Sequence, residues 1–135
     1  MKKFIWLSLT LMTTLSYAQN VEIKKNSILV DNTETLKFEK INYSEYSIID
    51  KLGNEIINLQ FKDNGTSFES DDYMTIYFVN SKKIIDSSNT GRIAGFGVKN
   101  MIKNFITWLL KEKVLDSNGE INEDKINDFK LKYGK

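Results

Sequence analysis

Apolar and polar side chains alternate at every second position in several short segments between residues 21 and 86. The clearest is segment 55–62, whose apolar residues are Ile57, Leu59 and Phe61 and whose polar residues are Asn58, Gln60 and Lys62. A period of two is typical of a strand that buries one face. A Gly-Asn turn at 53–54 separates this segment from the apolar run before it, which predicts a β-hairpin.

Comparable segments predict an antiparallel meander of about six strands. They cover residues 27–31, 35–40, 43–50, 55–62, 73–79 and 82–85, and a shorter stretch of the same kind lies at 66–70. Segment 73–79 is apolar or aromatic at both odd and even positions. We therefore expect it to be a central strand that is covered on both faces.

Beyond residue 97 the apolar period becomes that of an amphipathic helix. Its stripe consists of Val98, Met101, Ile102, Phe105, Ile106, Leu109 and Leu110. This predicts a helix over about 98–113, with Phe105 in the core. Asn122 is suited to cap a second helix at about 123–133, and Gly134 is suited to end it. Strands followed by helices predict an α+β domain whose helical hairpin packs on the sheet.

The first 18 residues have the anatomy of a secretory signal peptide. Lys2 and Lys3 precede an apolar run of twelve residues, and small residues stand before Gln19. The run is shorter than the ~20 residues of a membrane span. Removal of 18 of the 135 residues leaves 117, which suits one domain, at 19–135, with no transmembrane span. We therefore expect export to the periplasm or the medium, in a form that begins at Gln19.

Composition excludes several kinds of chemistry. The chain has no His and no Cys, so His-dependent or thiol nucleophilic sites and ordinary zinc or copper sites are excluded. Without Lys2 and Lys3 the 19 basic residues become 17 against 18 acidic ones, a net charge of −1 that does not suit nucleic acid. Segments 86–97 and 114–125 resemble calcium loops but lack the closing acid. We expect no cofactor, no metal and no catalytic residue.

The stretch "GRIAGFG" at 91–97 contains Gly91, Gly95, Gly97 and the only arginine, Arg92. Its glycine spacing fits neither common phosphate-loop pattern. We interpret it as a joint from strand to helix, whose glycines adopt positive φ and whose arginine pairs with a carboxylate of the same chain. Asp86 and the Asp71-Asp72 pair are the expected partners. An anion site at the helix start is the alternative. Trp108 either widens the helix stripe or, if exposed, anchors a partner.

The signal segment ending in Ala-Gln, the stretch "IIDKLGNEII" and the tail "LLKEKVLDSNGEINEDKINDFKLKYGK" together resemble small uncharacterised secreted proteins of Bacteroidota. The resemblance implies an exported location and brings no known activity. Our leading hypothesis is an exported, non-enzymatic domain that binds an unknown protein or cell-envelope component. A small-ligand carrier with a pocket between sheet and helices is the alternative. A hydrolase that uses two carboxylates is a third hypothesis.

Overall fold

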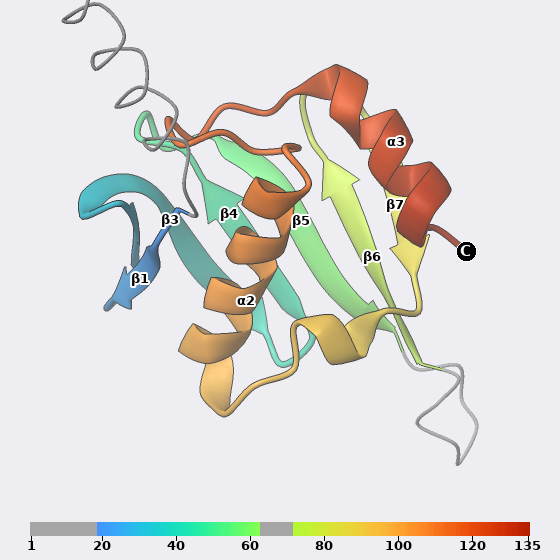
Figure 1. Cartoon of the computed structure of the whole chain (residues 1–135). Coiled ribbons are helices and arrows are strands. Elements are labelled where there is room, and N and C mark those ends of the chain that lie inside the picture. Colours follow the sequence, from blue (N-terminus) through green and yellow to red (C-terminus); the bar gives the residue numbers. More distant parts are fainter. Residues whose placement is uncertain (1–18, 63–71) are drawn as a thin grey trace, which may run out of the picture.

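The computed structural model describes residues 19–62 and 72–135 (Figure 1). Their strands form one seven-stranded antiparallel sheet, in which the spatial order follows the chain order from β1 to β7. The strands are β1 (Val21–Lys24), β2 (Ser27–Val30), β3 (Thr33–Asn42), β4 (Glu45–Ile49), β5 (Glu55–Lys62), β6 (Tyr73–Phe78) and β7 (Lys83–Ser87). The predicted meander is confirmed, with β1 as an additional strand. The expected segment 66–70 lies outside the described residues.

The predicted hairpin between β4 and β5 is present. Asp50 Oδ1 accepts hydrogen bonds from the backbone N–H groups of Leu52 and Asn54, each at 2.9 Å. Gly53 has φ +88°, a left-handed conformation that glycine adopts without strain from a Cβ atom. Local chemistry of the turn therefore sets the register in which β4 pairs with β5.

Two α-helices, α2 (Gly97–Lys111) and α3 (Glu123–Tyr133), lie on the same side of the sheet (Figure 1). A 3-10 helix, η2 (Thr90–Arg92), connects β7 to α2. The Asn122 side chain caps α3 by accepting a hydrogen bond from the backbone N–H of Asp124, at 3.2 Å. The predicted second helix has the observed bounds, and the first begins one residue earlier and ends two residues earlier than expected.

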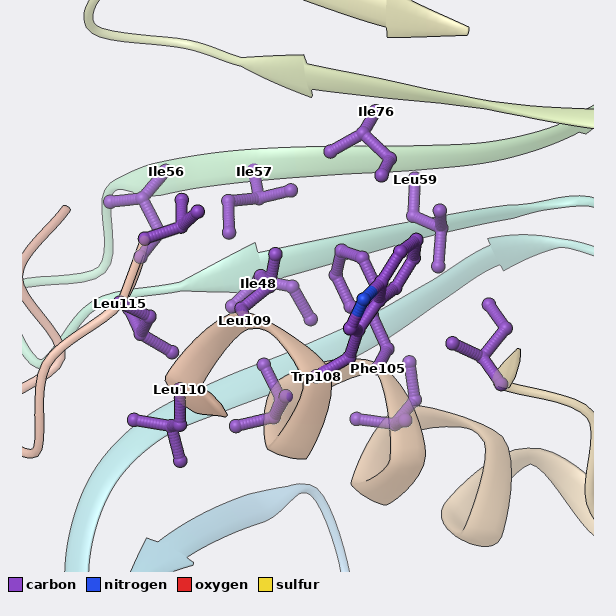
Figure 2. Packing of buried hydrophobic residues seen from close by; sticks show 14 of the residues in the cluster. Ile48, Ile56, Ile57, Leu59, Ile76, Phe105, Trp108, Leu109, Leu110 and Leu115 are labelled. Carbon is purple, nitrogen blue, oxygen red and sulfur yellow. The ribbon is translucent and has the colours of Figure 1, made fainter. Parts of the chain in front are cut away.

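The core fills the space between the sheet and the helices. Figure 2 shows Phe105, Trp108 and Leu109 of α2 facing side chains from β4, β5 and β6. Those strand residues are Ile48, Ile57, Leu59 and Ile76, and each of them has a relative exposure of 0%. Phe105 and Leu109 are also 0% exposed, so the predicted place of Phe105 in the core is confirmed.

Strand β6 differs from its expected position. It is the sixth of seven strands, and its side chains alternate between buried and half-buried. Met74, Ile76 and Phe78 point into the core, whereas Tyr73 and Tyr77 are half-buried on the other face. The prediction of a central strand covered on both faces is therefore wrong. Tyrosine combines a large ring with a polar hydroxyl, so its presence does not require a second covered face.

Candidate functional site

The stretch at 91–97 is a joint between η2 and α2, but only one of its glycines has positive φ. Gly97, at the start of α2, has φ +81°. Gly95 lies so close to α2 that an added Cβ would be 3.1 Å from Cβ of Asn100. Gly91 has neither restriction, since an added Cβ would meet nothing within 4 Å. The expectation that all three glycines supply left-handed turns is corrected accordingly.

Arg92 stacks on two aromatic rings of the helices. Its guanidinium carbon lies 4.7 Å from the ring centroid of Tyr133 and 5.7 Å from that of Trp108. In the described part of the chain, no carboxylate lies within 4 Å of its side-chain nitrogens. Of the expected partners, Asp86 accepts a hydrogen bond from Thr75, at 2.7 Å, Asp72 forms no ion pair with Arg92 in the described chain, and Asp71 lies outside the described residues. Arg92 therefore connects the joint to the two helices through cation–π contacts.

Glu112, at the end of α2, joins Arg92, Trp108 and Tyr133 in one cluster of contacts. Its carboxylate accepts hydrogen bonds from the Tyr133 hydroxyl, at 2.5 Å, and from Lys132 Nζ, at 3.3 Å. Burial by itself raises the pKa of Glu112, but the hydrogen bonds and the charges of Lys132 and Arg92 outweigh it and hold the pKa below its ordinary value. The cluster therefore stabilises the packing of α3 against α2.

Trp108 belongs to the core and does not form an exposed anchor. It is 4% exposed, and its ring centroid lies 4.7 Å from that of Phe129 and 4.9 Å from that of Tyr133. Its indole N–H has no hydrogen-bond acceptor among the described residues. Of the two expectations for Trp108, the widened helix stripe is confirmed.

The face of the sheet away from the helices carries an ordered set of side chains, which we call the open face. Its members are Glu45 and Ser47 of β4, Glu55, Asn58 and Gln60 of β5, Thr75 and Tyr77 of β6, and Ile84 and Asp86 of β7. The strand register aligns Ser47, Asn58, Tyr77 and Ile84 in one row across four strands. Adjacent strands are about 4.8 Å apart, so this row spans roughly 14 Å.

Hydrogen bonds hold the polar centre of the open face. The Asn58 amide nitrogen donates to Glu45, at 2.9 Å, and to Glu55, at 3.4 Å. The Ser47 hydroxyl donates to the same oxygen of Glu55, and Gln60 donates to Asn58 Oδ1, at 3.0 Å. Ser47 is only 4% exposed and Asn58 only 8% exposed. The network therefore fixes the positions of these side chains.

Carboxylates on or beside the open face outnumber the lysines there, Lys37 of β3 and Lys62 of β5. Glu45, Glu55 and Asp86 belong to it, and Glu39 of β3 is in register with Ser47. Among residues 19–62 and 72–135, none of these four carboxylates has a basic nitrogen within 4 Å. Apolar surface lies beside this charge, since Ile84 is 53% exposed. The face can therefore attract positive charge and bury apolar groups in one contact.

Two larger grooves lie at the edges of the domain. One, of about 500 Å³, is at the end of the sheet near Leu52 and Ile121. The other, of about 660 Å³, lies between β1 and the start of α2. Phe105, Trp108 and Leu109 line neither groove. The groove of about 500 Å³ is lined by Ile56 and Phe78 of the sheet and by Ile121 and Glu123 at the start of α3, whereas the space between the sheet and the middle of α2 is filled by the core.

The segment resembling a calcium loop at 114–125 has a different local role. Asp116 Oδ1 accepts hydrogen bonds from the backbone N–H groups of Asn118, at 2.8 Å, and Glu120, at 3.0 Å. This carboxylate closes the turn between the two helices. In the part of the chain that the structure describes, no three acidic side chains converge in a group that could hold a metal ion.

Comparison with known proteins identifies no relative. No family model matches the chain, and neither a curated protein nor a solved structure matches it. None of the described helices combines the length and the apolar character that crossing a membrane requires. Functional inference therefore depends on the geometry of the domain itself. The sequence did contain a signal for the open face, because Asn58 and Gln60 alternate with buried residues, but not for the hydrogen-bond network that joins β4 and β5.

Proposed function

We propose that this protein is an exported, non-enzymatic domain that binds a protein or cell-envelope component through the open face. The observation that carries the proposal is the row formed by Ser47, Asn58, Tyr77 and Ile84. It places a fixed polar pair, an aromatic ring and an exposed aliphatic side chain in line across four strands. Fixed side chains lose little conformational freedom on binding, which favours affinity.

Charge supports a partner that presents lysine or arginine beside an apolar group. A solvated sheet face commonly sets opposite charges across neighbouring strands, because such pairs stabilise the sheet. Two carboxylates of the open face, Glu45 and Glu55, instead bond to Asn58, and neither has a basic nitrogen within 4 Å in the described chain. Complementary charge on a partner would speed association and fix its orientation.

The arrangement gives less support to the other two hypotheses. A two-carboxylate hydrolase requires two acids that face each other across a cleft. Glu45 and Glu55 instead bond to one amide on the same sheet surface. A carrier needs an enclosed apolar pocket, whereas buried side chains fill the space between the sheet and the middle of α2, and the groove near Ile121 is also lined by Asp50, Lys51 and Asn118.

Site-specific photocrosslinking in cells tests the proposal. A benzoylphenylalanine residue replaces Tyr77 on the open face or, as the control, Tyr43, which is 92% exposed. We expect a discrete crosslinked species from position 77 and none from position 43. Ile84→Lys should remove that species because it adds positive charge to the binding surface. The matched control Leu131→Lys, at an 87% exposed position of α3, should leave it intact. Equal crosslinking from both positions, or none from position 77, would contradict the proposal.

A further inference from the structure

The joint before α2 exposes an apolar tip. Residues 94–97 are Ala, Gly, Phe and Gly, and all four are exposed. The side chain of Phe96 is 96% exposed, which is higher than for any other large hydrophobic residue among those described. A single exposed apolar residue needs no explanation. Here, however, four consecutive residues at the surface present no polar side chain.

Two carbonyl groups of this tip, those of Ala94 and Phe96, accept hydrogen bonds from side chains of α2. Asn100 donates a hydrogen bond to the carbonyl oxygen of Phe96, at 2.7 Å. Asn104 donates to the carbonyl oxygens of Ala94, at 3.2 Å, and Ile93, at 3.4 Å. A carbonyl group that already accepts a hydrogen bond has a smaller free-energy cost of transfer out of water. The tip can therefore enter a medium that offers few hydrogen bonds.

Positive charge surrounds the tip. The groove of about 660 Å³ that contains Phe96 is also lined by Lys24 of β1 and by Lys99 and Lys103 of α2. None of these lysines forms an ion pair within the described chain. Helix α2 contains no acidic residue. One carboxylate, that of Glu22, also lines the groove, so the local balance is three positive charges against one negative.

We propose that the tip at 94–97 docks on an anionic lipid surface, with Phe96 inserted at the level of the headgroups and the three lysines contacting lipid phosphates. A protruding ring on a glycine-flanked tip suits the lipid interface, which needs no shape-matched pocket. Basic residues and a few apolar side chains together give reversible binding to anionic bilayers. This surface lies on the helix-bearing side of the domain, so the protein could hold lipid while the open face remains free.

Vesicle co-sedimentation tests the inference with the form that begins at Gln19, which contains every described strand and helix. We expect binding to phosphatidylcholine vesicles that contain about 30% phosphatidylglycerol, and weak binding to pure phosphatidylcholine, because the lysines act on surface charge. Phe96→Ser and the double change Lys99→Gln with Lys103→Gln should each reduce binding about fivefold or more. Leu131→Ser, at another exposed apolar position, should have no effect.

A spectroscopic variant reports insertion directly. Tryptophan in place of Phe96 should shift its emission to shorter wavelength with anionic vesicles, whereas Trp108 is already buried and should not respond. Equal binding of Phe96→Ser and the unsubstituted protein, or no binding to anionic vesicles, would overturn the inference. So would inorganic phosphate at about 10 mM abolishing binding while Phe96→Ser does not change it, since that result would indicate a simple anion site.

Discussion

Replacement of Phe105 by alanine tests the packing of α2 on the sheet. The ring is 0% exposed and lies among Ile48, Leu59 and Trp108 in the centre of the core (Figure 2). Loss of a buried phenylalanine ring removes its transfer free energy and leaves a cavity, a combined effect of about 3–5 kcal/mol. A domain of this size has a free energy of unfolding of roughly 6–17 kcal/mol. The variant should therefore still fold, with much reduced stability.

Thermal unfolding followed by circular dichroism measures the effect. An unfolding entropy of about 2.1 cal/mol/K per residue gives about 0.25 kcal/mol/K for the domain, so a loss of ~4 kcal/mol lowers Tm by roughly 16 °C. Phe96→Ala is the matched control, because it makes the same chemical change at a side chain that is 96% exposed. It should change stability by less than ~0.5 kcal/mol. A loss below ~1 kcal/mol for Phe105→Ala, or equal losses for both variants, would refute the packing.

Three further predictions concern Arg92 in the joint, Glu112 between the two helices, and signal-peptide cleavage. Arg92→Lys should lower the free energy of unfolding by about 0.5–1 kcal/mol in a urea titration, because an ammonium group stacks less well on Tyr133, and a loss above ~2 kcal/mol would indicate an ion pair instead. The lowered pKa of Glu112 means that its contribution to stability is present above about pH 4.5 and is lost as the pH falls through the folded-state pKa. Glu112→Gln should therefore destabilise the protein at neutral pH by an amount that shrinks as the pH falls below about 4.5, and a constant difference would count against this. Intact mass of the exported protein should correspond to a chain that begins at Gln19, and retention of residues 1–18 would contradict export by signal cleavage.

Local patterns predicted the elements and their packing. The stripe that includes Ile102 and Phe105 defined α2, and the capping residue Asn122 defined the start of α3. The Gly-Asn turn defined the hairpin of β4 and β5. These predictions held because each depends on residues within a few positions of one another. The prediction that β6 is covered on both faces failed at its half-buried tyrosines, because aromatic side chains with hydroxyl groups occur on both covered and uncovered faces.

Partners distant in the sequence could not be predicted in the same way. Arg92 stacks on Tyr133, which follows it by 41 positions in the printed sequence, and it could equally have met a carboxylate. The polar network of Ser47, Glu55 and Asn58 requires the register of two strands, including the irregularity beside Ile49. The exposure of Phe96 depends on how η2 directs the chain into α2. In each case the tertiary structure decides which of several chemically suitable residues become neighbours, and the sequence alone does not distinguish them.

Oxidative footprinting of the protein in an envelope fraction from its native cells asks whether the open face is covered by a partner, as we propose. Hydroxyl radicals oxidise accessible tyrosine rings, so the rates at Tyr77 and Tyr43 can be compared within one sample. We predict that Tyr77 is oxidised more slowly in the envelope fraction than in buffer, while the rate at Tyr43, which is 92% exposed, does not change. Equal rates at Tyr77 in both samples would contradict the claim.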